Sequence, residues 1–121
     1  LIIRNDWGFP GVIVTDDLSM LEDSGDERFE SLPENAVLAV QAGADLLIDS
    51  GGLTATEQSE RIGGAVDRIV RAIESGELSL AAVESSAERV LVWRLSLGAV
   101  PRPLEDSESG ELSSQTGAVG G

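Results

Sequence analysis

The segment Gly11-Val12-Ile13-Val14-Thr15, followed directly by Asp16-Asp17, decides the fold of this chain. Its three central residues are adjacent, apolar and β-branched, so an extended backbone there presents apolar side chains on both faces. That pattern is typical of a strand buried on both sides, as in a parallel sheet. Because function in parallel α/β folds lies at the carboxyl ends of the strands, Asp16 is the first candidate for chemistry. Asp17 should point the other way, since side chains alternate along a strand.

Signals for a helix, a strand and a second helix follow in that order. Residues 31–34 have the spacing of a capping box, which predicts a helix that begins there and ends at Gly43. Residues 45–49 are a second short apolar run bounded by acids, and they predict another strand. Residues 54–57 form another capping box, which predicts a helix that ends at Gly76.

A last helix should begin at Ser79 and turn one apolar side inward. That inner side is predicted to consist of Leu80, Val83, Ala87, Val90, Leu91 and Leu95. The acidic residues 22–34 predict a solvated loop, and residues 99–121 predict a disordered tail or linker. Alternating strands and helices indicate α/β architecture with a parallel sheet. Two strands alone do not make a stable sheet with both faces covered, so we expect association or a larger (β/α) domain.

Composition excludes several classes of chemistry. The 121 residues carry a net charge of −14, all eight positive residues are Arg, and there is no Lys, His or Cys. The chain therefore contains no histidine base, no imidazole metal ligand, no disulfide and no thiolate nucleophile. A charge this negative argues against nucleic acid or an anionic membrane surface as a partner. Acidic surfaces with few Lys occur both in salt-adapted proteins and in ordinary soluble ones.

Three segments resemble glycoside hydrolase family 3. Residues 7–20 (WGFPGVIVTDDLSM) resemble the family's nucleophile segment. Residues 36–48 (AVLAVQAGADLLI) resemble its next helix and strand, and residues 72–98 (AIESGELSLAAVESSAERVLVWRLSLG) resemble its closing helices. The form Thr-Asp-Asp-Leu-Ser-Met is more similar to the β-N-acetylhexosaminidase branch. The β-glucosidase branch more often has a Trp where this chain has Asp17.

The resemblance implies a fold and a reaction. Residues 1–98 would be the C-terminal portion of a TIM-like (β/α)8 barrel, incomplete as given, within the family's N-terminal catalytic domain. The substrate would be a carbohydrate, hydrolysed with retention and without a cofactor or a metal, and terminal β-linked N-acetylglucosamine-type sugars would be removed. Asp16 would be the nucleophile that attacks the anomeric carbon. Ser19 and Met20 would contact the substrate.

The chain departs from the family where the proton donor should be. In the hexosaminidase branch the acid/base is a His–Asp pair before the nucleophile, and this chain has no His. We therefore expect the isolated chain to be inactive and to need the N-terminal part of the barrel. Three alternatives remain open: a β-glucosidase of the same family, a non-catalytic sugar-binding remnant, and a phosphoacceptor receiver domain. The last normally requires a strand-end Lys, which is absent.

Overall fold

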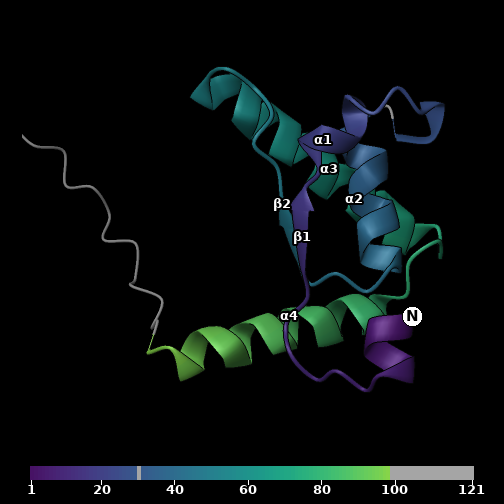
Figure 1. Ribbon diagram of the computed structural model, residues 1–121, viewed down its shortest axis with the longest axis vertical. Helices are drawn as coiled ribbons and strands as arrows, with labels where there is room; N and C mark the ends of the chain where they lie inside the picture. The colour runs from purple at the N-terminus through teal and green to yellow at the C-terminus, as the bar shows by residue number, and fades with distance from the viewer. Residues whose placement is uncertain (30, 99–121) are drawn as a thin grey trace, which may run out of the picture.

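The computed structural model describes residues 1–29 and 31–98 as a helix-rich α/β arrangement (Figure 1). In chain order the elements are the π-helical turn η1 (Ile2–Asp6), β1 (Val14–Asp17), α1 (Ser19–Glu22), the 3-10 turn η2 (Glu27–Phe29), α2 (Leu32–Gln41), β2 (Leu46–Ile48), α3 (Ala55–Glu74) and α4 (Leu80–Ser96). Short turns therefore interrupt the predicted solvated loop 22–34. The predicted tail, residues 99–121, lies outside the described residues.

The two strands pair in parallel, as the sequence predicts. Val14 lies opposite Leu46, and Asp17 lies opposite Ile48. β1 begins three residues later than expected and includes both Asp16 and Asp17. The reason is that β2 has only three residues, so it pairs only with the carboxyl-terminal part of the apolar run.

The core lies between the sheet and the α2–α3 pair, which covers one face of the strands (Figure 1). Its buried side chains form two clusters, one of Leu18, Leu32, Ala36 and Ala65 and the other of Val37, Ala72 and Leu78. Leu47 packs against the first cluster from β2. These side chains remove apolar surface from water and hold the two helices against the strands.

The expectation of a barrel portion is wrong. The described residues form a helix-rich structure with a two-stranded sheet rather than a piece of a (β/α)8 barrel. The strands are also not buried on both faces, because the side chains of Val14 and Ile48 are 49% and 46% exposed. An apolar run favours a strand, but it does not by itself establish that both faces are covered.

The last helix is correctly located, but its predicted inner side is wrong. None of the residues of α4 is buried, and Leu91 and Leu95 are more than half exposed. Figure 1 shows α4 running beneath the sheet, away from the core. Over the part of the chain that the structure describes, no helix combines the length and the apolarity that crossing a membrane requires.

The two predicted capping boxes, at the starts of α3 and α2, have different outcomes. At α3, the Thr54 hydroxyl accepts the Glu57 N–H and the Glu57 carboxylate accepts the Thr54 N–H, which confirms the predicted capping box. At α2 the helix starts as predicted, but Ser31 makes no side-chain cap. The Glu34 carboxylate binds Arg68 instead, 2.7 Å from Nε to Oε1. The second predicted capping box therefore does not form.

Candidate functional site

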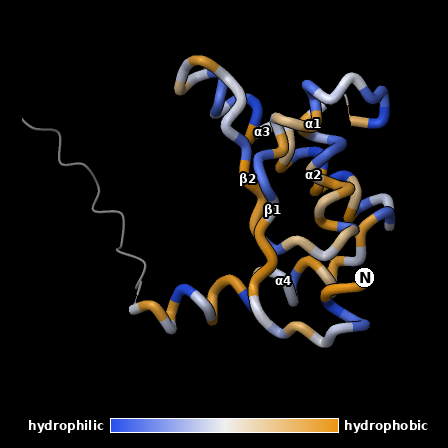
Figure 2. The backbone as a smooth tube through the Cα atoms, viewed as in Figure 1, coloured by the Kyte–Doolittle hydropathy of each residue, from blue (hydrophilic) through white to orange (hydrophobic). Residues whose placement is uncertain are grey.

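The two strand-end acids differ sharply in their surroundings. The side chain of Asp16 is exposed, and its Oδ1 accepts a hydrogen bond of 2.8 Å from the backbone N–H of Asp17. Figure 2 shows that β1 changes from hydrophobic to hydrophilic toward this end. The strand thus presents the Asp16 carboxylate to solvent on a fixed backbone.

Both carboxylate oxygens of Asp17, in contrast, accept hydrogen bonds. Its Oδ1 accepts the backbone N–H groups of Ser19 and Ser50, each at 3.0 Å, and its Oδ2 accepts the Ser50 hydroxyl. These hydrogen bonds, that of the Ser50 hydroxyl foremost, hold the pKa of Asp17 well below its usual range. Asp17 therefore stays ionised and joins the end of β1 to the loop after β2.

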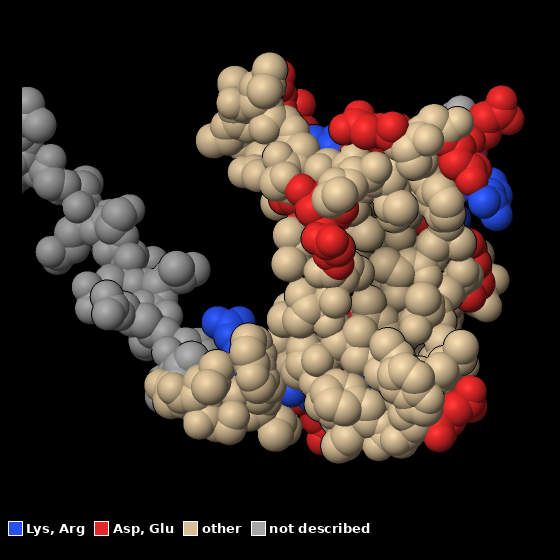
Figure 3. All heavy atoms as spheres, in the orientation of Figure 1, with Lys and Arg blue, Asp and Glu red and all other residues tan. Residues whose placement is uncertain are grey.

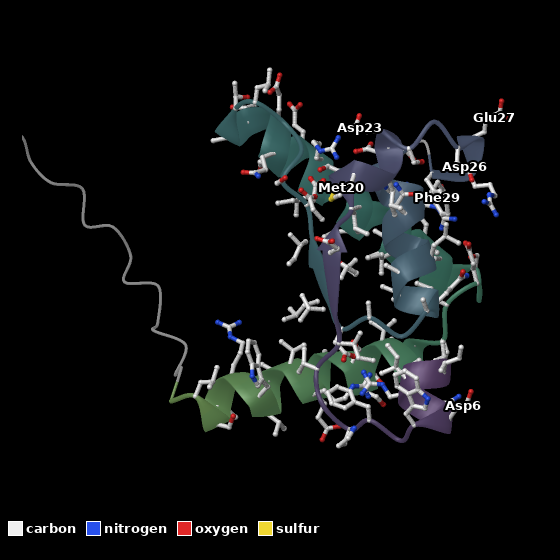
Figure 4. All side chains as sticks on the ribbon, viewed as in Figure 1. Asp6, Met20, Asp23, Asp26, Glu27 and Phe29 are labelled. Carbon is white, nitrogen blue, oxygen red and sulfur yellow. The ribbon has the colours of Figure 1, made fainter. Side chains whose placement is uncertain are left out.

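An open hollow of about 390 Å³ lies at this end of β1. It is lined by Thr15, Asp16, Asp17, Leu18, Met20 and Leu21. Met20 is 62% exposed, and Figure 4 shows it near the carboxyl end of β1. Of the predicted site residues, the structure brings Asp16 and Met20 together. Ser19 does not line the hollow, and its backbone N–H binds Asp17.

Arg61 is a neighbouring residue that sequence reasoning missed. It lies on α3 and pairs with Asp49 at the end of β2, at 2.8 Å, and with Glu22 at the end of α1, at 2.5 Å. The side-chain hydrogen bond with Asp49 is the principal cause that raises the pKa of Arg61 above its usual range. This ion-pair cluster holds three elements together beside the hollow.

A buried ionic cluster lies at the opposite end of the sheet, where the two strands begin. The side chain of Asp45 is 0% exposed and pairs with Arg4 at 2.6 Å and with Arg89 at 2.7 Å. It also accepts the Ser86 hydroxyl at 2.7 Å and the Ile13 N–H at 2.8 Å. Burial by itself would raise the pKa of Asp45, but the hydrogen bonds from Arg89, Ile13 and Ser86 outweigh it and lower the pKa to about 2. The cluster lies far from the strand-end acids along β1, so we assign it to stability.

The charge around the site is mainly negative. Figure 3 shows acidic side chains gathered over the end of the molecule that carries α1 and η2. Asp23, Asp26 and Glu27 are labelled in that region in Figure 4. Among the described residues, however, no three acids are grouped so that they could hold a metal ion.

The comparisons with known proteins agree with the resemblance at the family level. The sequence profile of the glycosyl hydrolase family 3 N-terminal domain matches residues 1–93, so the chain belongs to this family. A search of curated proteins finds no significant match. The family profile covers every residue that we placed at the strand-end site.

A solved structure is similar as well. It comes from work on a GCN5-related glucosamine N-acetyltransferase region in a fungal multi-domain GH3 β-N-acetylglucosaminidase. The sequence identity is 27%, the TM-score is 0.61, and the match covers 77% of this chain. The match spans only 10% of that solved chain.

Proposed function

We propose that this chain carries the nucleophile of a retaining glycoside hydrolase that removes terminal β-linked N-acetylglucosamine-type sugars. The observation that carries the proposal is the contrast between the two strand-end acids. Asp17 accepts three hydrogen bonds, one from Ser19 and two from Ser50 in the loop after β2, whereas the exposed Asp16 accepts one from a backbone N–H in the described residues. Asp16 is therefore the carboxylate that a substrate can reach.

The chemistry follows from this difference. The Asp16 carboxylate attacks the anomeric carbon, the bond to the leaving oxygen breaks, and a glycosyl ester forms on the enzyme. Water then cleaves that ester and regenerates the carboxylate. Asp17 is poorly suited to this role because an attack would break its hydrogen bonds to Ser19 and Ser50. Met20 offers an apolar contact at the same hollow, and Ser19 would act from its edge.

Two observations support the N-acetylglucosamine class over glucose. The solved neighbour is described as part of a β-N-acetylglucosaminidase. The segment from Thr15 to Met20 also resembles the hexosaminidase branch, with Asp17 where the β-glucosidase branch more often has Trp. The Ser50 contacts give that Asp a role that a Trp side chain would not fill.

The proton donor would come from elsewhere in a longer polypeptide. Retaining hydrolysis needs a second group about 5 Å from the nucleophile or an equivalent proton shuttle. The chain has no His, and the nearby carboxylates of Asp17, Glu22 and Asp49 are bound to Ser50 or Arg61. We therefore propose that the isolated chain turns over no substrate.

The test compares variants of the full-length protein on two substrates. p-Nitrophenol release is measured from the β-N-acetylglucosaminide and from the β-glucoside. We expect preference for the first, and we expect Asp16→Asn to lower kcat by roughly a thousandfold or more, as removal of a nucleophile does. Asp23→Asn is the matched control, because Asp23 is an exposed acid outside the hollow, and it should leave kcat unchanged.

Each contrary result has a definite meaning. Full activity in Asp16→Asn would remove the nucleophile assignment. Preference for the glucoside would be compatible with Asp16 as the nucleophile but would contradict the proposed sugar. Sugar binding without turnover by the wild-type protein would favour a non-catalytic module.

A further inference from the structure

The strand that carries Asp16 contains an irregularity next to it. From Val14 to Asp17 the strand β1 advances three residues, whereas its partner advances only two, from Leu46 to Ile48. One extra residue is therefore accommodated at Thr15–Asp16, which is the count of a β-bulge. A bulge interrupts the backbone ladder and re-aims a side chain, and bulges are enriched beside active sites. Here the irregularity lies at the candidate nucleophile and the residue before it.

Side chains replace the backbone pairing that the bulge removes. The Thr15 hydroxyl oxygen accepts the backbone N–H of Ile48 at 3.0 Å. The Asp17 carboxylate accepts the backbone N–H of Ser50 at 3.0 Å and also accepts its hydroxyl. Residues on both sides of Asp16 thus hold the bulge to the second strand and its following loop, while Asp16 itself takes no part in this pairing.

Asp17 connects this side-chain pairing to the nucleophile. Its backbone N–H donates to Asp16 Oδ1 at 2.8 Å, while its own carboxylate is held by Ser50 and by the Ser19 N–H. The N–H that binds the Asp16 carboxylate therefore belongs to a residue, Asp17, whose own side chain is held in place. A carboxylate that accepts several N–H and O–H groups is a strong anchor, because hydrogen bonds to a charged acceptor are stronger than neutral ones.

We infer that Asp17 and Ser50 form a positioning pair that fixes the attack geometry of Asp16, an inference that rests on the proposed function. Asp17 does not touch the reacting atoms. It holds the Asp16 backbone against the loop after β2, so that the carboxylate meets the anomeric carbon in line. A misplacement of about 1 Å at a reacting group can cost about a hundredfold in rate.

Three variants should differ in how much kcat they lose. Asp17→Asn keeps the size of the side chain but turns one acceptor into a donor facing Ser50, and it should lower kcat by roughly 10- to 100-fold with little change in KM. Ser50→Ala loses the hydroxyl but keeps the backbone N–H, so its loss of kcat should be smaller. Ser50→Thr restores a hydroxyl and should recover kcat to within about threefold of wild type. Ser59→Ala, an exposed serine on α3, is the matched control and should be neutral.

The experiment is run on the full-length protein with 2,4-dinitrophenyl β-N-acetylglucosaminide, whose leaving group needs little protonation. Far-UV circular dichroism first checks that each variant is folded. Asp16→Gly is measured with and without sodium azide. Azide should restore turnover by displacing the dinitrophenolate and giving the α-glycosyl azide, because a small anion enters the space of the missing carboxylate. The positioning variants keep Asp16, so azide should not restore their rates.

The outcomes separate the two claims. If Asp16→Gly is active without azide, the proposed nucleophile is wrong. If Asp16→Gly is inactive and rescued, but Asp17→Asn and Ser50→Ala both keep kcat within twofold of wild type, the positioning pair is overturned. If Asp17→Asn does not fold, Ser50→Ala against Ser50→Thr decides, and equal kcat in those two variants would overturn the inference.

Discussion

Replacing Asp45 with Asn should destabilise the fold more than the same replacement of Asp16, Asp17 or Asp23. The side chain of Asp45 is fully buried and binds two guanidinium groups, those of Arg4 and Arg89. It is also the acceptor for Ser86 on α4 and for Ile13 before β1. The substitution keeps the shape of the side chain but leaves two partly buried cations without their anion.

The magnitude follows from the burial of the three partners. Removing one member of a buried ion pair costs about 3–5 kcal/mol, because the remaining charge is uncompensated. Arg4 and Arg89 are 16% and 28% exposed, so water partly solvates them after the change. We therefore expect the lower end of the range, about 3 kcal/mol. At about 4–8 °C per kcal/mol for a domain of this size, Tm should fall by roughly 12–24 °C.

The assay is thermal unfolding followed by circular dichroism at 222 nm, together with hydrogen exchange of α4. No residue of α4 is buried, and Arg89 and Ser86 tie it to Asp45, so its amides should lose protection first. Asp26→Asn is the control, because Asp26 forms a solvent-exposed pair with Arg28 and should leave Tm nearly unchanged. A Tm within 2–3 °C of wild type for Asp45→Asn, with unchanged exchange in α4, would refute the reasoning; that margin is less than about 1 kcal/mol.

The same residue predicts the pH dependence. The pKa of Asp45 is about 2 in the folded state against 3.8 for the free side chain, so its ionisation stabilises the fold above the unfolded-state pKa. That stability is lost as the pH falls through about 4 toward 2. Wild type should therefore lose more stability than Asp45→Asn between pH 5 and about 2 in urea titrations. Parallel losses in the two proteins would contradict this assignment.

Three further substitutions test local features by their change in Tm. Gly76→Ala should destabilise by about 1–2 kcal/mol, because Gly76 has a φ of +78° and the cost is purely conformational, with nothing within 4 Å of the new Cβ. Gly51→Ala should cost about 1–3 kcal/mol, since its Cβ would lie 2.5 Å from Arg61 Nη2 and displace that side chain from Asp49. Thr54→Ala should cost about 1 kcal/mol by removing the N-cap of α3. A change in Tm near zero for any of these would contradict the physical reason given for that substitution.

Local sequence signals predicted the three longer helices, α2, α3 and α4. The caps of α3 and α4 need only residues three positions apart, and both form as expected. The expected box at residues 31–34 failed because Glu34 binds Arg68, 34 positions later in the chain. A distant partner of opposite charge competes with a local cap, and the spacing of the cap residues carries no sign of that partner.

The architecture was less predictable. An apolar run indicates a strand, but what covers each face depends on elements elsewhere in the chain. Here α2 and α3 cover one face of the strands, and Val14 stays half exposed. The strands are therefore not covered on both faces, and the expectation of a barrel portion failed. For the same reason the apolar side of α4, including Leu91 and Leu95, was assigned to a core that does not receive it.

At the site, the sequence could place the two strand-end acids but could not identify the distant residues that hold Asp17 and Asp49. It placed Asp16 and Asp17 at the end of a strand, and the structure agrees. It could not reveal that Ser50, 33 positions later, engages Asp17. Nor could it reveal that Arg61 holds Asp49, because such pairs depend on how the elements pack.

The central claim is that Asp16 forms a covalent bond to the sugar, and trapping that bond tests it most directly. The full-length protein is treated with a 5-fluoro-β-N-acetylglucosaminyl fluoride, whose ring fluorine slows breakdown of the glycosyl ester while the fluoride leaves readily. Peptide mass spectrometry then locates the added sugar. We predict a label on the peptide containing residues 7–20, at Asp16, and no label in Asp16→Asn. A label on a different residue, or continued turnover with no label at Asp16, would contradict the account.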